Sequence, residues 1–171
     1  ALHDLKHVQV AHIVSVNNEC KELLLVLGRE THLSSEEVPI HCINLMTSQT
    51  TQCLLFTRQQ EKEYSCPYTS TLKTYLYEPN ASILKAGAFR SVSSIYNVEK
   101  LHPNSHLYTS DEYIPDFPGR KFRITGSSSL NKKGLKELIG TEKKANLTVR
   151  NFPTSVAELR KRLKLADGGD I

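Results

Sequence analysis

Residues 11–28 read AHIVSVNNECKELLLVLG, and this stretch decides the fold class that the sequence predicts. Its first part, residues 11–16, is a short β-branched apolar run that suits a buried strand of a parallel sheet. The two asparagines that follow interrupt the run, and their side chains can cap a helix. Residues 19–27 then place three leucines on one side of a predicted helix, which Gly28 would end.

The segments on either side extend this stretch into an alternating α/β order. Residues 2–8 have the apolar spacing of a helix, and residues 40–46 and 52–58 are strand-like runs joined by a polar turn. The predicted order is helix, strand, helix, strand, hairpin, strand. One parallel strand with two helices and a hairpin cannot bury both faces of a sheet well. We therefore expect that this domain is incomplete here, or that its missing strands come from elsewhere.

The middle of the chain predicts a second, smaller α+β segment. A strand covers residues 75–77, and Asn80 is placed to cap the helix that follows. The helix has an amphipathic face and is expected to continue until His102-Pro103, because a proline disfavours helix in the residue before it. A short strand at 106–109 and a proline-rich turn over 111–119 complete the segment.

The last fifty residues predict a β-α-β-α order. Apolar and basic residues alternate over 121–125 and again over 146–150, as expected for strands with one buried face. A helix that Gly140 would end lies between them. Ser155 and Glu158 form a capping-box pattern that begins the second helix. The final four residues look like a turn into one more strand.

Positive charge is concentrated in the second half of the chain. Residues 1–77 hold 6 Lys or Arg against 8 Asp or Glu, whereas residues 78–171 hold 16 against 10. Within 120–165 the counts are 13 and 3. This asymmetry indicates an anionic partner for the second half, with ordinary solvated helix faces as the alternative.

Several function classes find little support in the sequence. No apolar run approaches the roughly 20 residues of a membrane-spanning helix. The four cysteines form no CxxC pair, which favours a reduced, cytoplasmic protein. Cysteine and histidine have no metal-ligand spacing, so we expect no metal. Cys20, at the start of a predicted helix beside Lys21, is interpreted as a core thiol rather than a nucleophile.

Four motifs carry a resemblance to a known family. They are NECKELL at 18–24, YEPNASILKAGAF at 77–89, ANLTVRNFP at 145–153 and ELRKRL at 158–163. With them the chain resembles bacterial class I S-adenosylmethionine (SAM)-dependent methyltransferases that have a THUMP-like C-terminal domain.

The resemblance implies an order of domains. Residues 1–77 would be the C-terminal strands of the methyltransferase sheet, residues 78–120 a ferredoxin-like segment, and residues 121–171 a THUMP-like domain without its last strand. The rest of the methyltransferase domain would precede them in the same polypeptide.

The resemblance also implies SAM as the cofactor of the full-length protein. The glycine-rich donor-binding loop of that family has no counterpart in this chain, which contains no Gly-x-Gly. We therefore expect this chain alone to bind no SAM and to be inactive, and no catalytic residue can be carried over. Residues 78–80 are interpreted as a plain helix cap, with a cleft that faces the catalytic domain as the alternative.

RNA, either tRNA or rRNA, is the partner that the resemblance implies. The charge pattern agrees, because basic side chains that meet phosphates release counterions. We expect a sheet face beside a helix to carry the contacts, with candidate residues Lys121, Arg123, Arg150, Arg160, Lys161 and Lys164. Phe122 is expected in the core, while Tyr108, Tyr113 and Phe152 are candidates for exposure. The alternatives are a protein-interaction module with a basic face and a methyltransferase with a non-RNA substrate.

Overall fold

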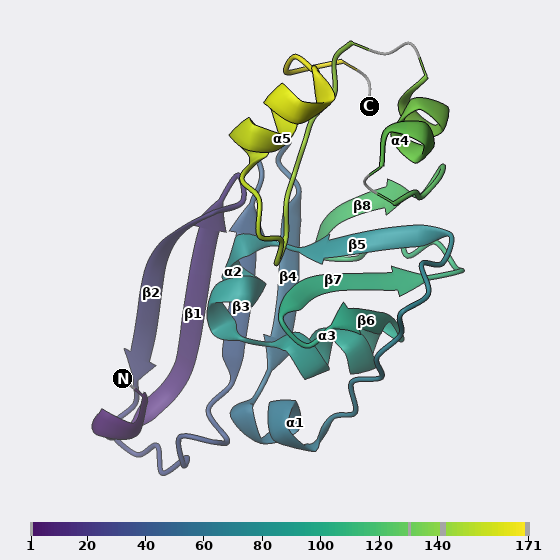
Figure 1. Cartoon of the computed structure of the whole chain (residues 1–171). Helices are drawn as coiled ribbons and strands as arrows, with labels where there is room; N and C mark the ends of the chain where they lie inside the picture. Colours follow the sequence, from purple (N-terminus) through teal and green to yellow (C-terminus); the bar gives the residue numbers. More distant parts are fainter. Residues whose placement is uncertain (1, 130, 141–142, 170–171) are drawn as a thin grey trace. The chain divides into compact units, whose positions relative to one another are not determined.

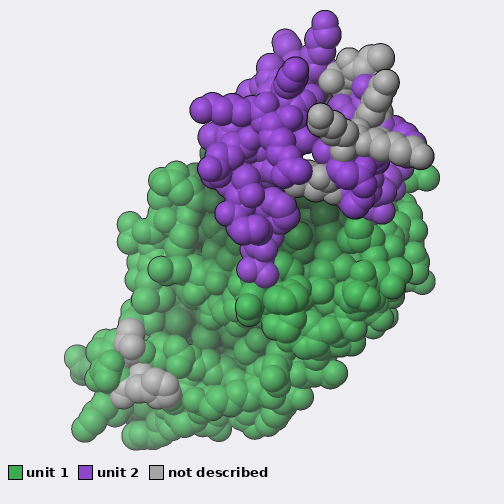
Figure 2. All heavy atoms as spheres, in the orientation of Figure 1, with its two compact units in different colours: residues 1–123 green, residues 124–171 purple. Residues whose placement is uncertain are grey.

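The computed structural model describes residues 2–129, 131–140 and 143–169, and it has a mixed α/β fold with two four-stranded sheets (Figure 1). The chain divides into two compact units, unit 1 with residues 1–123 and unit 2 with residues 124–171 (Figure 2). Both sheets belong to unit 1.

Sheet A has the strand order β2-β1-β3-β4. Its strands are β1 (Val8–Val16), β2 (Glu19–Leu27), β3 (Ile40–Leu45) and β4 (Thr51–Phe56), and a 3-10 turn, η1 (Leu2–Asp4), precedes them. β1 is antiparallel to β2 and parallel to β3, and β3 is antiparallel to β4. The strands expected at 11–16, 40–46 and 52–58 are confirmed.

The helix expected over residues 19–27 is wrong, because this segment is strand β2. Asn17 and Asn18 both have positive φ, 48° and 66°, which gives the two-residue turn of a tight hairpin. The turn sends the chain back along β1, where Leu23 pairs with Ile13. The leucine run fits either a helix or a strand, and the turn decides between them. The helix expected over residues 2–8 is only the short turn η1.

The rest of unit 1 builds sheet B and three helices. Sheet B has the order β6-β7-β5-β8, and all of its neighbours are antiparallel. The elements are α1 (Arg58–Glu63), β5 (Tyr75–Pro79), α2 (Ala81–Ala86), α3 (Phe89–Tyr96), β6 (Glu99–His102), β7 (Ser105–Ser110) and β8 (Gly119–Arg123).

The single helix expected to continue to His102 is wrong, because it forms two helices and a strand. Gly87 ends α2 in the left-handed region, at φ 75°, and Asn97 ends α3 in the same region, at φ 50°. His102 is the last residue of β6, which pairs with β7. The strand expected at 106–109 is confirmed as β7. The turn at 111–119 also forms, although Phe117 within it is buried at 1% exposure.

Three side-chain amides connect the two sheets of unit 1. Gln52 on β4 accepts hydrogen bonds from the amides of Asn44 on β3, at 3.0 Å, and Asn80 before α2, at 3.2 Å. Gln52 also donates to the carbonyl of Gly119 at the start of β8, at 3.3 Å. Asn44 and Asn80 are each 1% exposed and Gln52 is half-buried, so two of the three amides are shielded from water.

A carboxylate from α1 caps α3, which has no side-chain cap of its own. The two oxygens of Glu61 accept hydrogen bonds from the backbone N–H groups of Arg90, at 2.7 Å, and Ser91, at 2.8 Å. These N–H groups have no partner within the helix, and a negative charge there also opposes the positive end of the helix dipole. Glu61 therefore fixes α3 on α1.

Unit 2 contains two helices, α4 (Lys132–Ile139) and α5 (Val156–Leu163). The capping box of Ser155 and Glu158 is confirmed at the start of α5. The strand expected at 146–150 is wrong, since the structure gives these residues no strand. The strand expected at 121–125 exists, but as β8 of sheet B in unit 1. Asp170 and Ile171, where a further strand was expected, lie outside the described residues.

We predict that Asn80→Ala lowers the free energy of unfolding by about 1–3 kcal/mol, because it removes a helix cap and leaves Gln52 short of a buried partner. The side chain of Asn80 also accepts from the N–H of Ile83, at 3.3 Å. Urea denaturation measures the change. Asn104→Ala, at an exposed turn residue, is the control and should change the free energy by less than about 0.5 kcal/mol. Equal effects of the two variants would contradict the role of the network.

A second prediction concerns Lys100, which is 2% exposed and donates to the carbonyl of Pro103 at 2.7 Å. Burial lowers the pKa of this amine below its usual 10.5. The unfolded state therefore binds more protons between the two pKa values, and stability should rise with pH in that window. Denaturation curves from neutral pH toward 10.5 should show this rise in the native protein relative to Lys100→Met. Parallel curves for the two proteins would contradict it.

Candidate nucleic-acid interface

Unit 2 carries most of the excess positive charge of the chain. Residues 124–171 hold 10 Lys or Arg against 5 Asp or Glu, whereas residues 1–123 hold 12 against 13. An anion-binding surface is therefore expected on unit 2, which includes helix α5.

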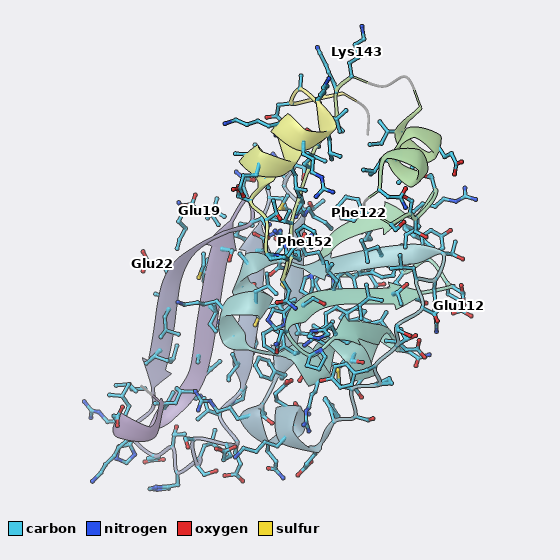
Figure 3. The ribbon with its side chains drawn as sticks, viewed as in Figure 1. Glu19, Glu22, Glu112, Phe122, Lys143 and Phe152 are labelled. Carbon is cyan, nitrogen blue, oxygen red and sulfur yellow. The ribbon has the colours of Figure 1, made fainter. Side chains whose placement is uncertain are left out.

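Two segments of unit 2 pair along their backbones and bring lysines together. The N–H of Ala166 donates to the carbonyl of Lys143 at 2.8 Å, and the N–H of Ala145 donates to the carbonyl of Ala166 at 3.1 Å. Lys143 and Lys144 therefore run beside the segment that leaves α5 at Lys164. All of these lysine side chains are exposed, as is that of Lys161 on α5. Lys143 is labelled in Figure 3. We call Lys143, Lys144, Lys161 and Lys164 the lysine cluster.

Sequence reasoning singled out two members of the lysine cluster and missed Lys143 and Lys144. These two residues lie beside the segment that follows α5 because the backbone at 143–145 pairs with Ala166, about twenty residues further along the chain. The signal available in the sequence was the basic pair itself, which lies in the segment with the largest positive excess.

Arg160 differs from its predicted role as an outward cation. Its guanidinium forms an ion pair with Asp167 and donates to the carbonyl of Ala145 at 3.4 Å. Its side chain is only 22% exposed. Arg160 therefore holds α5 against the paired segments, and the expectation that it faces solvent is wrong.

The predicted sheet face with Lys121, Arg123 and Arg150 does not form. Lys121 and Arg123 lie on β8 of sheet B, whereas Arg150 belongs to unit 2 and lies outside any strand. The ammonium of Lys121 donates to the carbonyl of Pro115 at 2.6 Å. Arg123 and Arg150 are exposed, and Arg150 donates to the carbonyl of Val149 at 2.9 Å.

Three of the four aromatic side chains considered from the sequence are exposed, and one is buried. Phe122, expected in the core, is instead 44% exposed, and the guanidinium of Arg120 lies 5.7 Å from the centre of its ring. Tyr113 and Phe152 are exposed, as considered from the sequence. Tyr108 is buried, and its hydroxyl donates to the carbonyl of Phe89 at 3.0 Å.

In the motif at residues 78–80, both Glu78 and Asn80 form contacts within the fold. Glu78 is 6% exposed and forms an ion pair with Arg120, its cross-strand neighbour on β8. Asn80 is the N-cap of α2, and its own N–H donates to the carbonyl of Pro118 at 3.0 Å. The interpretation of this motif as a helix cap accounts for these contacts.

The thiols and imidazoles show no metal centre within the described ranges, where no group of three or more His, Cys, Asp or Glu side chains is arranged to hold an ion. Cys20 lies on β2 and is exposed, so both the predicted helix start and the core position are wrong. Cys42 is buried, and burial raises the pKa of its thiol to about 12. No helix in the described part of the chain is long and apolar enough to cross a membrane.

Two protein families match consecutive segments of the chain. Residues 75–118 match a family of ferredoxin-like domains, and residues 119–171 match a family described as THUMP domain-like. No curated protein matches the chain.

A solved structure is similar over nearly the whole chain. It is a Porphyromonas gingivalis W83 protein that is provisionally named a methyltransferase. The two share 44% sequence identity with a TM-score of 0.89, and the match covers 98% of this chain. This chain spans 42% of the length of that solved chain. The chain thus contains a ferredoxin-like and a THUMP domain-like segment and is similar to part of a protein provisionally named a methyltransferase.

We predict different effects for two neighbouring cations of α5. Arg160→Ala removes a partly buried ion pair and a hydrogen bond, and should destabilise unit 2 by about 1–2 kcal/mol. Lys161→Ala changes an exposed side chain and should stay within about 0.5 kcal/mol. Hydrogen exchange of the α5 amides measures both. Faster exchange in Lys161→Ala than in Arg160→Ala would contradict the structural role of Arg160.

Proposed function

We propose that this chain is the RNA-targeting portion of a SAM-dependent RNA methyltransferase, with the catalytic domain preceding it in the same polypeptide. The observation that carries the proposal is the coincidence of two features in unit 2. The THUMP domain-like match covers residues 119–171, and the lysine cluster lies within it. The similarity to a longer protein named as a methyltransferase supports the catalytic half of the proposal.

Within this proposal the domain assignment from the sequence is retained. Residues 1–77 are the end of a class I methyltransferase domain, residues 78–120 the ferredoxin-like segment, and residues 121–171 the THUMP-like domain. We expect a cytoplasmic protein whose substrate is tRNA or rRNA.

The residues that line the cavity over sheet A do not suit SAM. The cavity over sheet A has no glycine in its lining, and its charged groups are Lys21, Glu22, Arg58 and Lys85. Three cations against one carboxylate would repel the sulfonium of the donor, and this lining has no glycine to ease a close approach of backbone to a ligand. We therefore assign no step of methyl transfer to these residues, and SAM binding belongs to the proposed catalytic domain.

The contribution of this chain is electrostatic binding and orientation of RNA. Lysine ammonium groups act as exposed point charges that meet phosphate oxygens, so binding should depend on the RNA backbone more than on base identity. Lys121, Arg123, Arg150 and Arg160 remain candidates, with the lysine cluster as the primary site.

Fluorescence anisotropy with bulk tRNA at two salt concentrations tests the RNA-binding proposal. We expect binding that weakens steeply with salt, with a slope that falls by about 0.7–0.9 for each phosphate-contacting lysine that is removed. Replacing the four residues of the lysine cluster by Gln should lower the affinity by about tenfold or more.

The matched control replaces four exposed lysines of unit 1 by Gln: Lys6, Lys21, Lys62 and Lys85. This variant has the same net charge and should keep most of the affinity. Equal losses in both variants would indicate a net-charge effect and no defined site. If the native chain does not bind tRNA at low salt, the proposal that it binds RNA without the catalytic domain is wrong. A specific acidic protein partner without RNA affinity would favour the protein-interaction alternative.

A further inference from the structure

Strand β8 combines one aromatic ring with a dense run of cations. Residues 119–123 read GRKFR, which contains 3 Lys or Arg and no Asp or Glu. Among the described strands β8 pairs only with β5, so it is an edge strand of sheet B. A cationic edge strand concentrates a polyanion such as RNA beside the side chains that the strand presents.

Phe122 lies on the face of sheet B that points away from the core, and it is labelled in Figure 3. Directly paired residues share one face of a sheet, and Phe122 pairs with Leu76 on β5. The next residue of β5, Tyr77, lies on the opposite face, where it is buried in the hydrophobic core. Phe122 is 44% exposed and Leu76 is half-buried. A regular strand therefore presents the ring of Phe122 to solvent.

The other side of this face is covered by the chain itself. The register continues the row from Leu76 to Thr109 on β7. Thr109 is fully buried, and its hydroxyl accepts a hydrogen bond from the N–H of Lys73 at 2.9 Å. The segment before β5 thus covers the face at β7 and leaves it open at β8.

Arg120 and Glu78 hold the ring of Phe122 in place. The guanidinium of Arg120 lies over the ring, 5.7 Å from its centre. The same guanidinium forms an ion pair with Glu78, which is only 6% exposed. A cation that a buried carboxylate holds over an aromatic ring orders the ring before any ligand binds. A ring that is ordered in advance loses less conformational entropy on binding.

We propose that Phe122 is a stacking platform for an unpaired base of RNA, which would lie on the part of the ring that Arg120 leaves open. The cations of β8 would attract the phosphates on either side of that base. Every base has an aromatic face, so stacking adds affinity without selecting base identity, and it requires a base outside a double helix.

The inference rests on the proposed function, because it takes RNA as the ligand. It adds that the RNA is bound at an unpaired segment, which phosphate contacts of the lysine cluster alone do not require. It also separates two kinds of contact, since loss of a stacked base should weaken binding without changing its dependence on salt.

Fluorescence anisotropy with the full-length protein tests the platform. The two probes are a labelled single-stranded RNA oligonucleotide that cannot pair with itself and a labelled RNA duplex of the same length. Phe122→Leu keeps an apolar side chain on β8 but removes the aromatic face. It should weaken binding of the single strand by about tenfold with an unchanged salt slope, and it should leave binding of the duplex unchanged.

Two further variants complete the design. Phe122→Tyr restores a ring at the same position and should bind the single strand as the native protein does. Phe152→Leu is the matched control, because Phe152 is 47% exposed but lies outside any helix or strand. This variant should bind both RNAs like the native protein.

Each outcome decides the inference. Equal affinity of the native protein and Phe122→Leu for the single strand overturns it, and so does an equal loss for the single strand and the duplex. Failure of Phe122→Tyr to restore binding, or an equal loss in Phe152→Leu, also overturns it. Salt-dependent RNA binding that persists in Phe122→Leu and falls in the lysine-cluster variant would leave the proposed function standing. If the native protein binds neither RNA, both the inference and the proposed function are wrong.

Discussion

The buried amide network of Asn44, Gln52 and Asn80 is the interaction on which the rest of unit 1 depends. Asn44 and Gln52 belong to sheet A, Asn80 begins α2, and Gln52 reaches the backbone at the start of β8. Buried amides are costly unless they are paired, so the hydrogen bonds of Asn44 and Asn80 favour the arrangement of sheets that satisfies both. Through Gln52 they connect the start of α2 and the start of β8 to sheet A.

Charge separates the two units by role. Unit 1 is nearly neutral, and its charged side chains form contacts within the unit. Examples are the Glu61 cap of α3 and the Glu78–Arg120 ion pair. Unit 2 has a cationic surface. Within it, the guanidinium of Arg160 forms an ion pair with Asp167 and a hydrogen bond to the carbonyl of Ala145. The same helix thus carries one cation that stabilises the fold and others that remain available to phosphates.

The short sequence motifs that start helices were predicted correctly. The Asn80 cap and the Ser155–Glu158 capping box both start the helices expected of them. The prediction failed at residues 19–27 because LLLVL suits a helix and a strand equally, and the positive φ of the two preceding asparagines cannot be read from composition. The sequence predicted only part of the candidate site. The pairing of Lys143 with Ala166 joins distant segments, and the contacts that hold Arg160 to Asp167 and Ala145 depend on this pairing.

Transfer of a labelled methyl group from SAM by the full-length protein tests the central claim most directly. The account predicts labelled tRNA or rRNA with the native protein, and a large loss of label when the lysine cluster is replaced by Gln while SAM binding is unchanged. Equal labelling of RNA by the native protein and the variant would contradict the role assigned to the lysine cluster. Label that appears in protein or a small molecule, with none in RNA, would contradict the RNA methyltransferase itself.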